Sequence, residues 1–192
     1  MSDQTVSNSR ISAFIFDLDG TLVETEKLKA RSYANVVGGL TGANSPDHRA
    51  ISLYERITGS TDEMVCRQMI DEFGIAEALE PVDGELWKHL HQLRMDEYRG
   101  NDGLPEHLLA NGYRHNIDLL REQKAMGRTV SVATSSFSDE AKRVLDALGL
   151  RVLLDDIVGR EFVKNPKPDP EIYLLAMARL GVEPEQVIII ED

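Results

Sequence analysis

Short apolar runs near the two ends of the chain form the clearest pattern in the sequence. Each run is rich in β-branched or aromatic residues and leads into acids, hydroxyls or glycine, which is typical of a buried parallel strand that ends in a loop. Three runs are clear, at 11–16, 129–136 and 186–192, and a weaker fourth surrounds Ile157. The pattern therefore predicts four strands.

Amphipathic stretches between these runs end at glycines, as helices commonly do. The stretches "NIDLLREQKAMG", "DEAKRVLDALG" and "DPEIYLLAMARLG" end at Gly127, Gly149 and Gly181. In the last of them, Asp169 and Pro170 are suited to the N-cap and the first turn. Strands that alternate with helices predict an α/β fold with a doubly wound, Rossmann-like parallel sheet.

The segment 23–112 interrupts this alternation, because its apolar residues recur at helical spacing and show no strand pattern. Glycine-containing breaks separate the helical groups within it. We predict an α-helical module over 23–112, inserted into an α/β core made of 11–22 and 113–192, after a polar tail over 1–10. The groups are Ala30, Tyr33, Ala34 and Val37, then Cys66, Met69, Ile70 and Phe73, and then Leu86, Leu90 and Leu93.

Composition narrows the class of protein. The chain has 192 residues, 42% of them hydrophobic, and a formal net charge of -12. This acidic balance disfavours nucleic-acid and anionic-membrane partners, which are bound through clustered Lys and Arg. The single cysteine, Cys66, excludes an internal disulfide and indicates a reducing compartment, and the polar start lacks a signal peptide. We therefore expect a cytoplasmic enzyme that acts on a small molecule, with its oligomeric state left open.

Polar side chains gather at the predicted carboxyl ends of the strands, where doubly wound sheets bind ligands. Carboxylates crowded at such an edge repel one another, and a divalent cation removes the repulsion. Hard oxygen ligands of this kind suit Mg²⁺. The first strand leads to Asp17 and Asp19, the second to Thr134, Ser135 and Ser136, the last to Glu191 and Asp192, and Lys167 lies in the loop before the last helix.

These residue types suit phosphoryl transfer. A carboxylate can attack phosphorus and form an aspartyl-phosphate, which splits one difficult displacement into two easier ones. A second acid, two residues further on, can protonate the leaving oxygen and later activate water. A hydroxyl and a lysine can hold the transferring oxygens.

The order of these signatures resembles the haloacid dehalogenase-like hydrolase superfamily. The signatures are "DLDGTL", the helical insertion, "ATSS", "KPDP" and "ED", and they span nearly the whole chain from Ile11. The nearest subgroup has a helical cap inserted after the first motif, as in phosphoglycolate phosphatase and β-phosphoglucomutase. The resemblance implies a phosphoric monoester hydrolase with an α-helical cap. Such an enzyme uses Mg²⁺ to hydrolyse a small phosphorylated metabolite through an aspartyl-phosphate.

The resemblance also implies a role for each site residue. It implies that Asp17 attacks phosphorus and binds the metal, and that Asp19 is the acid/base and binds the metal through its backbone carbonyl. It also implies that Thr134, Ser135 and Lys167 bind phosphate and that Glu191 and Asp192 complete the metal site.

Departures from the family keep two alternatives open. Lys29 stands where the mutases carry a cap histidine, and Asp62 stands where they carry an arginine, so a phosphatase is favoured over a β-phosphoglucomutase-like sugar-phosphate mutase. The family continues past its fourth motif with a loop, a helix and a short strand, whereas this chain stops at Asp192. An open edge is therefore expected on the last strand, and a truncated, inactive family member is the second alternative.

Three further points concern single motifs. Glu191 and Asp192 could instead form a solvated terminus. Lys164 is a rival of Lys167 for phosphate binding, although Pro168 favours Lys167. The GxxxxGK[ST] loop is absent from the sequence, which excludes the P-loop nucleotidases.

Overall fold

The computed structural model describes residues 11–43 and 46–192, and the predicted polar tail over 1–10 lies outside these residues. The chain forms two compact units. Within the described residues, the first contains 11–24 together with Leu109–Asp192, and the second is Thr25–Leu108. The predicted insertion, 23–112, extends beyond the second unit because Val23 and Gly112 pair with each other as an antiparallel bridge.

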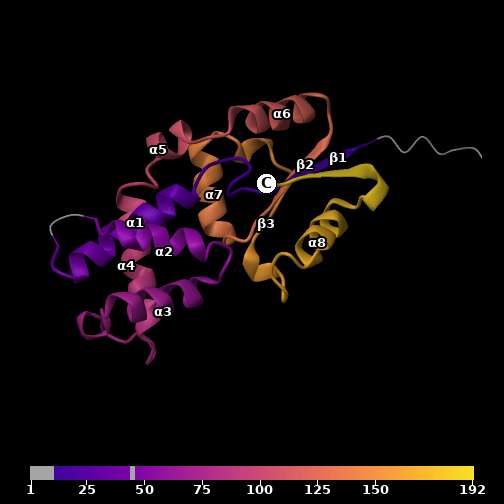
Figure 1. The fold of residues 1–192 in the computed structure, drawn as a ribbon. Coiled ribbons are helices and arrows are strands. Elements are labelled where there is room, and N and C mark those ends of the chain that lie inside the picture. The colour runs from indigo at the N-terminus through magenta and orange to yellow at the C-terminus, as the bar shows by residue number, and fades with distance from the viewer. Residues whose placement is uncertain (1–10, 44–45) are drawn as a thin grey trace, which may run out of the picture. The chain divides into compact units, whose positions relative to one another are not determined.

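The first unit is built on a four-stranded sheet in which every pairing is parallel. The strand order is β3-β2-β1-β4, so the first strand of the chain lies in the interior of the sheet (Figure 1). This confirms the predicted α/β class with a parallel sheet. The strands are β1 (Ala13–Phe16), β2 (Thr129–Ala133), β3 (Asp156–Val158) and β4 (Val187–Ile190).

The register aligns the carboxyl ends of the three strands that carry the predicted site. Phe16, at the end of β1, lies opposite Val132 of β2 and Ile190 of β4. The residues that follow these positions therefore emerge at one edge of the sheet. The apolar runs predicted longer strands than form, because the polar residues at their ends leave the ladder and enter loops.

Three helices of this unit follow the predicted pattern: α6 (Arg114–Ala125), α7 (Ser138–Ala147) and α8 (Glu171–Leu180). On α8, Ile172, Ala176 and Met177 are buried in a cluster with Ile15 and Ala133 of the sheet. At its start Pro170 occupies the N-cap, one residue later than the predicted Asp169, and the Asp169 carboxylate accepts a hydrogen bond from the Glu171 N–H at 2.9 Å.

All the secondary-structure elements assigned to the described residues of the second unit are helices, and they are joined by turns and loops that include an isolated bridge between Val82 and Glu85. Its core is one apolar cluster to which α1, α2, α3 and α4 contribute. The sequence pattern indicated α1, α3 and α4 and missed α2, a short helix capped by Asp47 that buries few apolar residues. The helices are α1 (Glu26–Leu40), α2 (His48–Arg56), α3 (Asp62–Phe73) and α4 (Leu86–Gly100), with α5 (Pro105–Ala110) at the end of the unit.

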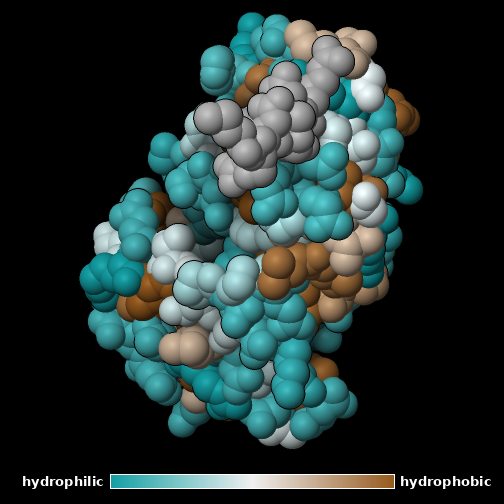
Figure 2. Space-filling model, turned by 90° about the vertical axis from the view of Figure 1, so that its right-hand side faces the viewer, coloured by the Kyte–Doolittle hydropathy of each residue, from teal (hydrophilic) through white to brown (hydrophobic). Residues whose placement is uncertain are grey.

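Two surface features bear on the earlier expectations. Within the described residues β4 has β1 as its single neighbour, and Ile188 and Ile189 on it are 38% and 41% exposed, as expected for an open sheet edge. The face of the molecule in Figure 2 is mostly hydrophilic, with small hydrophobic patches. No helix in the part of the chain that the structure describes is long and apolar enough to cross a membrane.

The core of the first unit makes a direct prediction for stability. Leu120 on α6 is fully buried, so Leu120→Ala leaves a cavity and is expected to lower the free energy of unfolding by about 2–5 kcal/mol in a urea titration. Leu174→Ala on α8, at a side chain that is 55% exposed, is the control and should change it by about 0.5 kcal/mol or less. Equal effects of the two substitutions would contradict this account of the core.

Candidate active site

Asp17 occupies the edge of the sheet directly after β1. Its backbone N–H donates to the carbonyl oxygen of Ile190 at 2.9 Å, so the pairing of β1 with β4 continues to the catalytic candidate itself. Asp17 is 5% exposed, and the Thr21 hydroxyl lies 3.5 Å from its Oδ2. The chain then turns tightly, because the N–H groups of Leu22 and Val23 both donate to the Leu18 carbonyl. This turn brings the Thr21 hydroxyl close to the Asp17 carboxylate.

Lys167 joins two of the predicted acids. Its Nζ lies 2.7 Å from Asp17 Oδ1 and 2.7 Å from Glu191 Oε1, and its side chain is 16% exposed. Burial raises the pKa of Asp17 to about 6, although the positive charge of Lys167 opposes this shift. Burial also disfavours the ammonium of Lys167, but the two carboxylates outweigh it and raise the pKa of Lys167. The lysine therefore stays charged and balances the buried acid.

Asp19 points to a different set of partners. The Ser136 hydroxyl donates to Asp19 Oδ2 at 2.7 Å, and the Thr134 hydroxyl lies 3.5 Å from the same oxygen. Thr134 is fully buried, and its Oγ1 accepts the N–H of Ser136 at 3.1 Å. The two acids of the first motif thus face separate neighbours, as expected if one attacks and the other transfers protons.

The structure brings together two of the three predicted phosphate-binding residues. Thr134 and Lys167 lie in the cluster, whereas Ser135 is exposed and its neighbour Ser136 makes the contact to Asp19. Ser136 was visible in the "ATSS" signature, but a strand pattern does not reveal which hydroxyl after the strand turns inward. A role for Ser135 stays a prediction.

Asp192 packs against the backbone of Gly20 in the first motif. Gly20 has φ +85°, a conformation that favours glycine, and a Cβ built on it would lie 2.7 Å from Asp192 Oδ2. Asp192 also contributes to the raised pKa of Tyr113, whose main causes are its hydrogen bond to Glu24 and burial. The last carboxylate of the chain therefore lies against the loop that carries Asp17 and Asp19.

Within residues 11–43 and 46–192 no three His, Cys, Asp or Glu side chains are arranged as a ready metal site. The ammonium of Lys167 lies between Asp17 and Glu191 and bridges them. The donor chemistry nonetheless fits Mg²⁺, since Asp17, Glu191 and Asp192 offer hard carboxylate oxygens at one edge of the sheet. The raised pKa of Asp17 indicates that its carboxylate would gain from a further positive charge.

Two acids that the sequence reasoning did not single out hold the loops of the site. The Glu171 carboxylate accepts the N–H groups of Lys164 and Asn165 at 2.9 and 2.8 Å, which fastens the loop of Lys167 to the start of α8. The Glu161 carboxylate accepts the N–H of Ser138 at 3.1 Å and also its hydroxyl, at the start of α7. Neither contact leaves a signal in the sequence, because both join separate segments through backbone donors.

The loop after β1 is also fastened from α6. The Asn116 side-chain amide donates to the Thr21 carbonyl at 2.8 Å, and the Tyr113 N–H donates to the Leu22 carbonyl at 2.9 Å. The Tyr113 hydroxyl donates to Glu24 Oε2 at 2.8 Å. Residues 21–24, which lead from the first unit into the second, are therefore held against the start of α6.

In the helical unit, the two residues that depart from the mutase pattern have charged neighbours of their own. Lys29 Nζ donates to Glu26 Oε1 at 3.1 Å, and Asp62 accepts a hydrogen bond from Arg94 Nη2 at 3.3 Å. Arg94 is 5% exposed, and its guanidinium also lies 5.2 Å from the centre of the Tyr33 ring. Where the mutase pattern has a positively charged residue, this chain has the negatively charged Asp62, which accepts a hydrogen bond from the buried Arg94.

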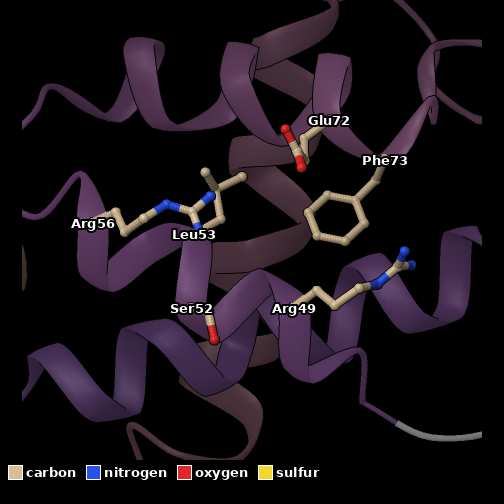
Figure 3. Close-up of a pocket in the computed structure, with 6 residues that line it drawn as sticks. All are labelled: Arg49, Ser52, Leu53, Arg56, Glu72 and Phe73. Carbon is tan, nitrogen blue, oxygen red and sulfur yellow. The ribbon is translucent and has the colours of Figure 1, made fainter.

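A separate pocket of about 240 Å³ lies between α2 and α3 of the helical unit (Figure 3). Arg49 lies over the ring of Phe73 at 5.1 Å, and Asp47 already neutralises its charge through two hydrogen bonds. The pocket contains none of the predicted site residues. Its lining is Arg49, Ser52, Leu53, Arg56, Glu72 and Phe73.

A buried aspartate paired with a lysine, a second aspartate with hydroxyl partners and the acids that follow β4 thus lie at one edge of a parallel sheet. The family model for haloacid dehalogenase-like hydrolases matches residues 11–192. The chain belongs to this family, so the predicted family and the predicted hydrolase class are confirmed.

Individual relatives support the same assignment. A phosphorylated carbohydrates phosphatase of Thermotoga maritima is 30% identical over 182 residues, which cover 95% of this chain and 76% of that protein. The pyrophosphatase PpaX of Bacillus velezensis is 27% identical over 192 residues, which cover 97% and 77% of the two chains. The crystal structure of CbbY from Rhodobacter sphaeroides in complex with phosphate matches with a TM-score of 0.66 and 26% identity, over 93% of this chain and 76% of that one.

The contact between Gly20 and Asp192 gives a testable prediction. Gly20→Ala places a methyl group where the flexible Asp192 carboxylate lies, so it should displace that carboxylate and weaken Mg²⁺ binding roughly tenfold in calorimetry. Gly127→Ala has similar left-handed strain, at φ +78°, but meets open space, so it is the matched control. Both variants should lose about 1 kcal/mol of stability, and equal Mg²⁺ affinities would contradict a metal role for Asp192.

Proposed function

We propose that this protein is a Mg²⁺-dependent phosphatase that hydrolyses a small phosphorylated metabolite through an aspartyl-phosphate. The observation that carries the proposal is the buried carboxylate of Asp17, held 2.7 Å from the ammonium of Lys167. A carboxylate so placed is shielded from water and lies beside a fixed positive charge that can receive a phosphoryl oxygen.

The residues divide the reaction between them. Asp17 attacks phosphorus, while Lys167 and the Thr134 hydroxyl hold the equatorial oxygens of the phosphoryl group. Asp19, oriented by Ser136, protonates the leaving oxygen and later takes a proton from the attacking water. Asp17, the backbone carbonyl of Asp19, Glu191 and Asp192 are the proposed ligands of Mg²⁺, which neutralises charge on the phosphoryl group when bound.

For the substrate we favour a phosphorylated carbohydrate. The support is that the relative with 30% identity is named for that activity. The pyrophosphatase relative makes pyrophosphate the competing substrate. We assign the helical unit, Thr25–Leu108, the role of the cap that selects the substrate.

The first test is hydrolysis of p-nitrophenyl phosphate with Mg²⁺ and with EDTA. We expect turnover that requires Mg²⁺ and falls roughly 10³-fold or more in Asp17→Asn, because the amide cannot attack phosphorus. Asp155→Asn is the control, since Asp155 is also ion-paired with a lysine but outside the site, and it should keep activity within about threefold. Absence of turnover in a folded wild-type chain would favour the inactive family member.

A second test separates the phosphatase from the mutase. With a sugar 1-phosphate as substrate, we expect inorganic phosphate and free sugar to accumulate, because Asp62 and Lys29 replace the two mutase signature residues. Chromatographic detection of the sugar 6-phosphate isomer as the main product would instead establish the mutase. The same assay with pyrophosphate ranks the two substrate classes by kcat/KM.

A further inference from the structure

The ammonium of Lys167 has a third neighbour besides its two carboxylates. Its Nζ lies 4.9 Å from the centre of the Tyr173 ring, within the range of a cation–π interaction. Tyr173 lies in the first turn of α8, six residues after Lys167. No signature in the sequence pointed to this tyrosine.

A third contact matters because the two carboxylates that hold the lysine are themselves proposed to exchange partners during the reaction. A lysine ammonium is a compact charge on a flexible four-carbon chain, so its position changes when the nearest anion changes. Asp17 and Glu191 directly follow the neighbouring strands β1 and β4, and both are proposed to contact substrate or metal. When those partners change during a reaction, a neutral aromatic face can keep the ammonium in place without competing for a phosphoryl oxygen.

Tyr173 is well placed to act in this way, because α8 fixes the ring and the lysine loop together. Its neighbour Ile172 is buried against the sheet, and the Tyr173 N–H donates to the Pro170 carbonyl at 3.0 Å. The adjacent Glu171 holds the loop of Lys167 through two backbone N–H groups. One rigid turn of helix thus sets the distance between the ring and the ammonium.

The hydroxyl of Tyr173 is buried near both Lys167 and Glu191, and it contributes to the raised pKa of Lys167 as well as to the lowered pKa of Glu191. Burial raises the pKa of Glu191, but the bonds from Lys167 and the nearby Tyr173 hydroxyl outweigh it and lower that pKa. The ring and the hydroxyl can therefore be separated by substitution.

From this geometry we infer that Tyr173 is a positioning residue for Lys167: its ring face holds the ammonium in the site while the partners of the lysine exchange between carboxylates and a phosphoryl group. The inference rests on the proposed function for its catalytic consequence. The contact itself can be tested whether or not the protein is a phosphatase.

The first arm measures how tightly Lys167 is held, through its rate of acetylation followed by peptide mass spectrometry. Lys164 is exposed, lies in the same loop and serves as the internal reference. Tyr173→Phe keeps the ring and should leave the ratio of the Lys167 to the Lys164 rate within about twofold. Tyr173→Leu removes the ring and should raise the ratio roughly tenfold.

The second arm measures hydrolysis of p-nitrophenyl phosphate with Mg²⁺ and its inhibition by inorganic phosphate. Tyr173→Leu should raise KM and the inhibition constant of phosphate roughly tenfold with a smaller change in kcat, whereas Tyr173→Phe should behave as wild type. Leu174→Ala, at the exposed neighbouring position of α8, controls for disturbance of the helix. If Tyr173→Leu fails to fold, Tyr173→Met fills the space without an aromatic face.

The outcomes separate the two proposals. An unchanged acetylation ratio in folded Tyr173→Leu or Tyr173→Met overturns the role of the ring, whatever the activity. A Tyr173→Phe variant that behaves like Tyr173→Leu also overturns it, because the hydroxyl would then hold the lysine. If wild type shows no hydrolysis while the acetylation ratio rises in Tyr173→Leu, the phosphatase proposal fails and the Lys167–Tyr173 contact stands.

Discussion

The buried pair between Asp17 and Lys167 is the interaction on which the rest of the site depends. Burial alone strongly disfavours an ionised carboxylate, and Asp17 is only 5% exposed. Its pKa rises to about 6 even with the ammonium 2.7 Å away. Without that positive charge the pKa of Asp17 would lie higher still, because Lys167 is the main cause that opposes the effect of burial. Every element that places Lys167, from the loop before α8 to Glu171 and Tyr173, therefore bears on the state of Asp17.

The sheet supplies the second constraint, because it brings together residues far apart in the chain. The register places the ends of β1, β2 and β4 side by side, so residues separated by more than 100 positions share one edge. Asp17 extends the pairing with β4 by one residue, and Gly20 permits the close approach of Asp192. The site is thus a consequence of strand order and alignment, and the loops add the direction of each side chain.

These two constraints explain what could be predicted from the sequence. The strands, the helices that follow them, the helical insertion and the family were readable, because apolar periodicity and ordered motifs encode them locally. The choice of Ser136 as the hydroxyl on Asp19 was not readable, since loop geometry decides it. Helix α2 was missed because it has only nine residues, although Ala50, Leu53 and Tyr54 on it are buried. The roles of Glu161 and Glu171 were hidden because carboxylates that bind distant backbone N–H groups have no local pattern.

The acidic residues of this protein have different structural roles, and the composition does not distinguish them. A net charge of -12 indicates only an acidic chain. In the structure, Asp17, Glu191 and Asp192 supply charge at the sheet edge, whereas Glu161 and Glu171 bind backbone N–H groups and hold loops. Hydrogen bonds from N–H groups favour the ionised form, and they help to lower the pKa of Glu161 and Glu171, whereas burial raises that of Asp17. Glu161 and Glu171 thus stay ionised over a wider pH range than Asp17. The geometry of the site is therefore maintained under conditions in which the charge of Asp17 itself can change.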